Sequence, residues 1–372
     1  MIERVTGYRK LYRAGVLTVL LLGMASPLEA QFPSKSRKTT NSEAAFKAAL
    51  ISYRNRDYPL AVKQLTPLAK KNFAPAQAQL AYMYEYGIGV AKNQSEADRL
   101  YRKLMAAYLI RAATGDAEAR YQIGQLHYGG KGVPENVPEA MQWYLLAAEQ
   151  GHLLSQYKLA LLYDSGEKAP RDPAGAMHWY TMAAGQGHAI SQLFLAIKYY
   201  RGRDVGQDYA LAAEWFLKAA ENGNAYAQST LGFMYASGQG VPENKQQALD
   251  WYRRGAEQGD KDSQYDLGMK LSKGDGVPKS QAEAALWFRK AAAQGQMAAQ
   301  FELAQIYANG LGVGRDEVLA YAWFNVAIMS GHYPATKPRD ELAKTMSADD
   351  IAEAESISSQ WKYGQDLERQ YP

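Results

Sequence analysis

No cysteine occurs among the 372 residues, and there are only five histidines. The absence of cysteine excludes disulfides, cysteine-ligated zinc, iron–sulfur clusters, thiol catalysis and a lipid anchor on cysteine. Charge is nearly balanced, because 42 Lys and Arg stand against 38 Asp and Glu and leave a net charge of +4. A nucleic-acid-binding chain should carry a basic stripe instead. We therefore expect no nucleic-acid partner, no metal ion and no cofactor.

The first thirty residues have the composition of an export signal. Four Lys and Arg and one acidic residue in residues 1–13 precede an apolar stretch, AGVLTVLLLGMA at residues 14–25, and LEA precedes Gln31. That order is typical of a cleaved secretory signal, and the apolar stretch is shorter than the roughly 20 residues of a membrane span. We predict a signal peptide over residues 1–30 that is cut after Ala30. An uncleaved anchor is the alternative.

The mature chain is then expected in the periplasm, or secreted beyond the envelope, without a transmembrane helix. Half of the net charge leaves with the signal, because residues 1–30 contain four Lys and Arg and two acidic residues. Residues 31–41 are short, polar and basic, which predicts a flexible lead-in. A docking arm for an anionic surface is the alternative for this segment.

Tryptophan and glycine mark a fixed period along the rest of the chain. Six tryptophans follow one another at intervals of 36 residues, and seven glycines keep the same interval. A constant period of about 20–50 residues is the signature of a solenoid rather than of several globular domains. The two series are Trp143, Trp179, Trp215, Trp251, Trp287 and Trp323, and Gly115, Gly151, Gly187, Gly223, Gly259, Gly295 and Gly331.

Each unit, counted from the residue after one of these glycines, predicts a helical hairpin. The fourth residue is small, the eighth is aliphatic and the twelfth is often tyrosine, as in Ser155, Leu159 and Tyr163. A spacing of four places them on one face of a helix. A glycine-rich turn such as GQGVPEN (238–244) follows, and a second helix then carries the recurring tryptophan. We predict that the six tryptophans fill a buried core position and that stacked neighbours supply the core.

One unit departs from the period. The distance from Asn72 to Gly115 is 43 residues, and the seven surplus residues lie around MAAYLIR (105–111) in the second helix. Seven residues are nearly two turns at about 3.6 residues per turn, so the insertion should lengthen the helix and keep its buried face in phase. After the last unit, residues 332–372 predict helices that cover the open end of the stack, with Ser347 as an N-cap.

The recurring unit resembles the Sel-one-like repeat (SLR) family, a relative of the tetratricopeptide repeats. Over residues 73–331, about seven units, the marks are a small–x3–aliphatic–Gly/Ala–x2–Tyr run, a G-x-G-V-P turn and an A-x-x-W-Y/F-x-x-A-A run. Residues 42–71 resemble a tetratricopeptide hairpin more closely. The resemblance implies an all-α fold, a right-handed α-solenoid of stacked helix–turn–helix hairpins, and a role in binding proteins, without identifying the partner.

The repeat accounts for two features that elsewhere indicate a ligand site, the GxG turns and the histidines. The GxG turns, such as Gly130–Gly132, lack the preceding strand and βαβ unit of a nucleotide-binding loop, and they recur with the structural period. His152, His188 and His332 each follow a unit-closing glycine, so we expect them at helix starts along the stack and not around one ion. His127 stands where other units have tyrosine, which predicts a packed histidine.

The first helix of each unit carries a second set of aromatic and aliphatic residues. The sixth, tenth and thirteenth residues cluster within about 60° on the side opposite the small–aliphatic–tyrosine face. In tetratricopeptide relatives, matching positions line the concave groove that holds peptides. Exposed aromatic groups mark interaction surfaces, so we predict partner contacts on the concave face. This partner stripe comprises Tyr121, Tyr128, Tyr157, Leu161, Leu193, Ile197, Tyr200, Phe233, Tyr265, Met269 and Phe301.

Within the partner stripe, the five tyrosines are better suited to contacts, whereas Leu161 and Ile197 are better suited to packing. Tyrosine offers a large contact area at a low entropy cost and a polar tip for hydrogen bonds. The alternative for the whole stripe is that it packs against the unit's own second helix or against the next unit.

The constant unit length and the stripe favour a non-enzymatic scaffold. No catalytic motif such as H-E-x-x-H or G-x-S-x-G occurs, and no loop interrupts six units of 36 residues. We predict an exported adaptor that binds a protein or peptide on its concave face. An envelope glycan or peptidoglycan, held by the tyrosines, is the alternative partner. Binding or hydrolysis of β-lactams, described for disulfide-rich relatives, is a further alternative that the absence of cysteine undercuts.

Overall fold

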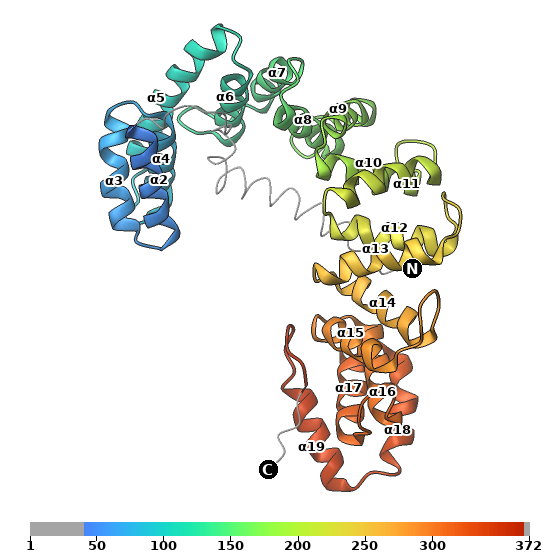
Figure 1. Ribbon diagram of the computed structural model, residues 1–372. Helices are drawn as coiled ribbons and strands as arrows, with labels where there is room; N and C mark the ends of the chain where they lie inside the picture. Colours follow the sequence, from blue (N-terminus) through green and yellow to red (C-terminus); the bar gives the residue numbers. More distant parts are fainter. Residues whose placement is uncertain (1–40, 368–372) are drawn as a thin grey trace. The chain divides into compact units, whose positions relative to one another are not determined.

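The computed structural model describes residues 41–367 of the chain. The predicted signal peptide and most of the predicted lead-in lie outside these residues. The described part contains eighteen α-helices, one short 3₁₀-helix and no strand (Figure 1). Within each of two units, consecutive helices pack as hairpins and successive hairpins stack. The fold is therefore the all-α solenoid that the sequence predicts, and it divides into two compact units, one ending at Ala183 and the other beginning at Ala184.

Unit 1 contains four hairpins. Its helix α5 has 20 residues, seven more than the 13 of α3, and the surplus leaves the buried face in phase. The buried residues of α5 are Ala97, Leu100, Tyr101, Leu104, Met105, Tyr108 and Ala112. The helices of unit 1 are α2 (Asn41–Arg54), α3 (Tyr58–Lys70), α4 (Ala74–Tyr86), α5 (Gln94–Ala113), α6 (Ala117–Gly129), α7 (Val137–Ala148), α8 (Leu153–Ser165) and α9 (Pro173–Gly185), whose end belongs to unit 2.

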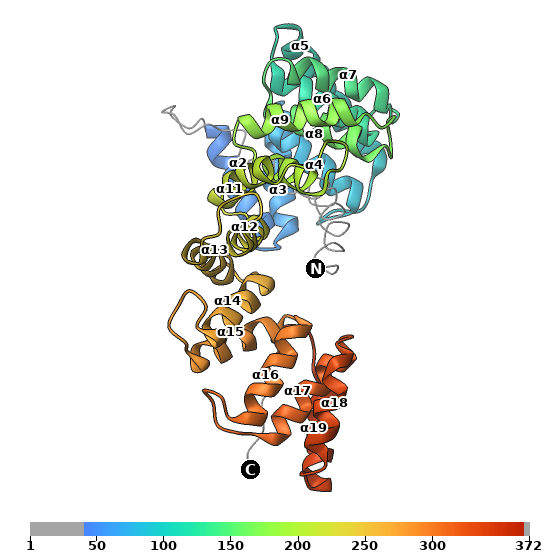
Figure 2. The same cartoon turned by 90° about the vertical axis from the view of Figure 1, so that its right-hand side faces the viewer.

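Unit 2 contains four further hairpins and a helical end. The hairpins are built from α10 (Ala189–Arg201), α11 (Tyr209–Glu221), α12 (Ala225–Ser237), α13 (Lys245–Glu257), α14 (Lys261–Lys273), α15 (Gln281–Ala293), α16 (Met297–Asn309) and α17 (Glu317–Met329). The end is built from η1 (Tyr333–Ala335), α18 (Thr336–Ala343) and α19 (Ala348–Ser359). Figure 2 shows α18 and α19 beside α17, against which both pack. Ser347 caps α19 by accepting a hydrogen bond from the Asp350 N–H at 3.1 Å.

The repeated small and aliphatic positions form the core of each unit. The fourth and eighth residues of the hairpins are buried, for example Ser155, Leu159, Ser263 and Leu267. Each first helix from α6 to α16 begins with a side chain that accepts a hydrogen bond from the backbone N–H three residues later, which satisfies one of the donors that a helix start leaves unpaired. The capping residues are Asp116, His152, His188, Asn224, Asp260 and Gln296.

The prediction that the tryptophans fill the buried position is wrong for four of the six. Trp179 and Trp323 are buried, whereas the others are half-buried: Trp143, Trp215, Trp251 and Trp287. The next residue along the chain carries the buried ring in every unit: Tyr144, Tyr180, Phe216, Tyr252, Phe288 and Phe324. The first helix makes room for that ring with a small residue, since a Cβ added to Gly268 would lie 2.8 Å from Phe288.

The glycine-rich turns serve the packing of one hairpin on the next. In five turns the second glycine has a positive φ and lies against the preceding second helix. A Cβ at Gly132 would lie 2.8 Å from the Cβ of Tyr101, and a Cβ at Gly240 would lie 2.2 Å from the carbonyl oxygen of Tyr209. Backbone conformation and lack of space both favour glycine here. These turns therefore have the structural role that their period indicates.

Buried glutamines at the fifth position of the units join consecutive hairpins, although their polarity suggests a solvated side chain. Each Nε2 donates to a backbone carbonyl at the end of the preceding second helix, 3.0–3.2 Å away. In unit 2 the Oε1 atoms of Gln192, Gln228 and Gln264 also accept from the end of the following second helix, at 2.8–3.0 Å. The donors to the carbonyls are Gln77, Gln156, Gln192, Gln228, Gln264 and Gln300.

Candidate functional site

The partner stripe lies on the first helices, and its sixth-position members in unit 1 face inward. Tyr121 and Tyr157 are only 8% and 3% exposed. Their rings pack against the buried ring of their own second helix, with centroids 5.8 Å apart for Tyr121 and Tyr144 and 6.4 Å apart for Tyr157 and Tyr180. Leu193 in unit 2 is buried as well. The expectation that these three stripe residues are exposed is wrong, because the helix turns its sixth residue toward its own hairpin.

The same position in the later hairpins of unit 2 is less enclosed. Tyr265 and Phe301 are half-buried, and their ring centroids lie 5.9 Å from those of Phe288 and Phe324. Phe301 also lies 5.0 Å from the ring of His332, which opens the segment after the last repeat. Both side chains therefore pack on their second helix and still show part of a ring at the surface.

The tenth and thirteenth positions divide into buried and half-buried members. Leu161 and Ile197 are buried, in keeping with the packing role predicted for them, so their expected exposure is corrected too. The stripe residues that stay partly exposed are Tyr128, Tyr200, Phe233, Tyr265, Met269 and Phe301. The surface that a partner can reach is therefore smaller than the sequence predicts.

Tyr128 is already engaged within unit 1. The Nζ atoms of Lys158 and Lys168 lie 4.0 and 4.6 Å from its ring centroid, where the ring attracts a cation. Lys158 is buried, and burial together with the charge of Lys168 lowers its pKa to about 8. In unit 2, the Tyr200 hydroxyl donates to Gln239 at 2.8 Å. The ring of Tyr128 and the hydroxyl of Tyr200 therefore already have partners within the protein, and less of each side chain is left for a ligand.

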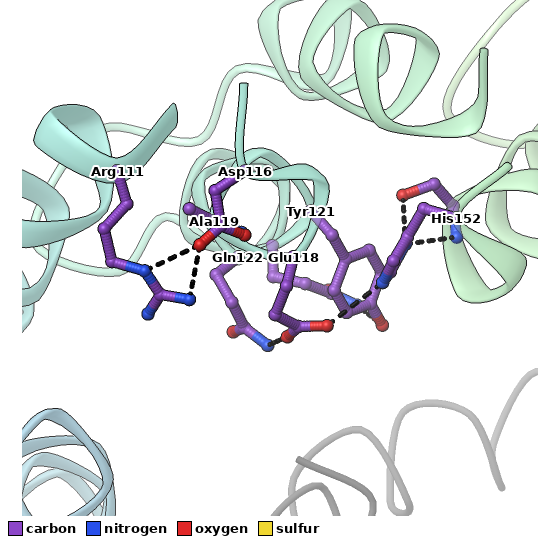
Figure 3. A network of polar contacts seen from close by, with 9 residues as sticks. Arg111, Asp116, Glu118, Ala119, Tyr121, Gln122 and His152 are labelled. Carbon is purple, nitrogen blue, oxygen red and sulfur yellow. Dashed lines mark hydrogen bonds and ion pairs between the residues drawn. The ribbon is translucent and has the colours of Figure 1, made fainter. Parts of the chain in front are cut away.

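A polar network joins α5, α6 and α8 in unit 1 (Figure 3). The Asp116 carboxylate that caps α6 also forms an ion pair with Arg111 at 2.7 Å. Glu118 accepts from Gln122 at 2.7 Å and contacts Nε2 of His152 at 3.0 Å. Burial raises the pKa of Glu118, but the hydrogen bonds from His152 and Gln122 outweigh burial and hold that pKa below its ordinary value.

These charged groups cap helices and join hairpins. Both ring nitrogens of His152 are engaged, since Nδ1 accepts from the Ser155 N–H at 3.2 Å and Nε2 faces Glu118. Over residues 41–367, no cluster of three or more His, Asp or Glu side chains is arranged to hold a metal ion. Within the same range, no helix has both the length and the hydropathy of a membrane crossing.

A small apolar hollow lies on unit 2, away from the partner stripe. Its volume is about 190 Å³, and its lining includes Leu286, Leu303 and Val313. Small-molecule sites measure about 300–1,000 Å³ and bring several polar groups together. Here the polar lining consists of Arg289 and Tyr307, which hydrogen-bond to each other. The hollow therefore lacks the size and the polar groups of a small-molecule site.

Unit 1 carries a row of tyrosines on its first two hairpins that the sequence prediction misses. The tyrosine ladder consists of Tyr58, Tyr53, Tyr82 and Tyr86, with centroids 5.2 Å apart for the first pair and 4.7 Å apart for the last pair. Counted from Asn72, Tyr82 stands at the tenth position, which belongs to the stripe. Asn72 adopts a φ of 58°, so it fills the place of the closing glycine. The partner stripe begins after Gly115, and Tyr53 and Tyr58 lie before the first repeat, so the stripe does not include these tyrosines.

The comparisons with known proteins agree with this architecture. The Sel1 repeat family model matches residues 74–104, 117–152, 153–188, 189–224, 225–260, 261–296 and 298–332. The chain is similar to the crystal structure of a protective antigen present in uropathogenic Escherichia coli strains displaying an SLR fold. Identity is 33%, coverage is 87% of this chain and 69% of that chain, and the TM-score is 0.63.

A second similar structure is a Sel1 repeat protein from Oxalobacter formigenes, with 28% identity, coverage of 85% of this chain and 99% of that chain, and a TM-score of 0.60. No curated protein matches the chain. The seven matched repeats fill most of the described residues, and the resemblance to the Sel-one-like repeats seen in the sequence is confirmed. The chain belongs to the Sel1 repeat family.

Proposed function

We propose that this protein is an exported, non-enzymatic scaffold that holds a protein or peptide partner on its first-helix face, the concave face of the solenoid. Sel1 repeat proteins generally act as protein–protein interaction scaffolds. The observation that carries the proposal is the row of half-buried aromatic and aliphatic side chains at the sixth and tenth positions of successive first helices, such as Phe233, Met269 and Phe301. Such groups gain contact area on binding at low entropy cost.

Export is part of the proposal. It rests on the basic, apolar and small-residue order of residues 1–30. Mass spectrometry of the mature protein should find an N-terminus at Gln31. A chain that retains Met1 in the cell would contradict cleavage.

Photo-cross-linking in cells tests the binding face. A benzoylphenylalanine replaces Ser237 or Lys273, which are exposed and lie one helical turn after Phe233 and Met269 on the same face. We expect both positions to capture the same partner band. The matched controls are exposed positions on second helices, Gln246 and Glu283, and should not capture it. Capture from the second helices alone would refute the first-helix face.

The other two alternatives from the sequence receive less support. Glycan stacking needs flat rings at the surface, but the stripe rings are buried or packed against neighbouring side chains. The β-lactam alternative comes from relatives with disulfides, and this chain has no cysteine. Protein or peptide binding is therefore the function that the described surface supports best.

A further inference from the structure

Positive charge is concentrated on the first two hairpins. Residues 41–115 contain eleven Lys and Arg but only five Asp and Glu, whereas residues 184–367 contain eighteen Lys and Arg and twenty-two Asp and Glu. All eleven basic side chains of residues 41–115 are exposed. The near-neutral total charge of the chain therefore hides a basic end in unit 1 and an acidic unit 2.

The acidic groups of the basic end are largely engaged. Asp57 caps α3 by accepting from the Leu60 N–H at 3.1 Å, and Glu96 pairs with Arg99. Glu85 pairs with Lys131 of the next turn and accepts from the Tyr101 hydroxyl at 2.9 Å. An approaching partner therefore meets an excess of positive charge that local carboxylates do not cancel.

The tyrosine ladder runs through this basic end. Tyr53 stands in α2, Tyr58 is the first residue of α3, and Tyr82 and Tyr86 stand on α4. The Nζ atom of Lys131 lies 5.7 Å from the Tyr86 ring centroid. Burial is the main cause that raises the pKa of Tyr53, and the neighbouring Tyr82 and Tyr58 raise it further. Tyr86 is 50% exposed and its three companions are half-buried, so part of each of the four side chains is accessible to a partner.

We infer that the tyrosine ladder and its rim of exposed cations are the docking surface for an extended acidic segment of a partner protein. The rim includes Arg56, in the turn between Tyr53 and Tyr58, and Lys92, beside Gly87. The inference rests on the function proposed above and adds the place and the chemistry of the partner. Phenol rings cover a peptide backbone and hydrogen-bond to it, while carboxylates of the segment meet the surrounding cations. A membrane surface is a different occupant, because interfacial binding relies on a continuous apolar face.

Fluorescence anisotropy with the full chain tests the inference. The probe is a fluorescein-labelled peptide of alternating Glu and Gly, and the matched probes replace Glu by Lys or by Ser. We expect only the Glu peptide to bind, and we expect its affinity to fall as ionic strength rises. The double variant Tyr82→Ala/Tyr86→Ala should bind it about tenfold more weakly. Equal binding of the three peptides would overturn the inference.

Two sets of variants separate the ladder from general effects. Lys92→Glu/Arg56→Glu reverses charge at the rim and should weaken binding as strongly as loss of the rings, while Tyr333→Ala removes an exposed tyrosine of unit 2 and should change nothing. Circular dichroism checks that each variant is folded. Binding to vesicles with phosphatidylglycerol but not to the Glu peptide would also overturn the inference. If the Glu peptide does not bind while position 237 still cross-links to the partner in cells, the inference about the ladder is wrong and the proposed function is retained.

Discussion

The two units differ at one position near the end of their second helices. In unit 2 a basic residue stands three positions after each half-buried tryptophan and lies over its ring: Lys218 is 4.1 Å from Trp215, Arg254 is 4.6 Å from Trp251, and Lys290 is 4.2 Å from Trp287. The fourth tryptophan, Trp323, is fully buried and is followed by the buried Val326. In unit 1 the same position holds Leu146 in α7 and Met182 in α9, whose side chains are 42% and 46% exposed. One unit covers its tryptophans with charge, and the other places apolar groups at the surface.

The difference teaches which positions of the repeat are free to vary. A half-buried tryptophan leaves part of its ring at the surface, and the residue one turn later is beside it. A cation there is attracted by the ring and keeps its head in water, whereas an aliphatic residue stays exposed as a potential contact. The adjacent buried ring has no such freedom. Each unit therefore shares a core rule and sets its surface separately.

Loss of the buried ring that the two units share is expected to have the largest effect on stability. Tyr144→Ala in unit 1 and Phe288→Ala in unit 2 each empty a fully buried site, so each should lower the free energy of unfolding by about 3–5 kcal/mol. Trp143→Ala and Trp287→Ala should cost less, because these side chains are half-buried. Urea unfolding followed by circular dichroism measures the four values.

A conservative variant controls for the loss of the ring. The buried Tyr144 hydroxyl has no hydrogen-bond partner among the described residues, so Tyr144→Phe should keep or raise stability. If Trp143→Ala costs more than Tyr144→Ala, the tryptophan and not its neighbour fills the core of unit 1. The two units would then differ in the residue that fills the core as well as in the residues at the surface.

These side chains show which parts of the core can be predicted from the sequence alone. The period and the fourth and eighth positions predict the hairpins, because small and aliphatic residues at a spacing of four have one stable arrangement. The choice between Trp143 and Tyr144 is open, since neighbours differ by about 100° around a helix and both are apolar. Tryptophan is large and rarely becomes fully buried, which decides the outcome.

The exposure predicted for the partner stripe is wrong for five of its eleven residues, for a related reason. Three positions share an arc, but the rotation of the helix against its hairpin partner decides that Tyr121 turns inward while Phe233 stays partly exposed. That rotation depends on packing, which one chain's spacing does not reveal. The tyrosine ladder was missed because Tyr53 and Tyr58 precede the first repeat, and Tyr82 and Tyr86 precede Gly115, where the partner stripe begins.

Acid should destabilise unit 2 more than unit 1, with a loss of up to about 3 kcal/mol in the free energy of unfolding. Burial lowers the pKa of His188, which caps α10 in unit 2, to about 4. The unfolded state therefore binds a proton between about pH 6.5 and pH 4 that the folded state does not, so stability is complete above this range and falls as pH drops through it. Urea unfolding at pH 7 and at about pH 4.5 measures the loss.

Asparagine supplies matched variants, because Asn224 is the equivalent cap of α12 and does not titrate. His188→Asn should remove most of the loss of stability in acid. His152→Asn in unit 1 should remove little of it, because Nε2 of the equivalent cap His152 lies 3.0 Å from the Glu118 carboxylate. An equal change from both variants would show that the two caps respond alike.

The smallest predicted effect exchanges the surfaces of the two units. Leu146→Lys places a cation one turn after Trp143 and should raise the free energy of unfolding by about 0.5–1 kcal/mol, whereas Lys290→Leu should lower it by a similar amount. Gln142→Lys adds the same charge to exposed surface of α7 without placing it over a ring. A gain as large from Gln142→Lys would assign the effect to net charge, and the contrast between the units would then lie in solubility and not in stacking.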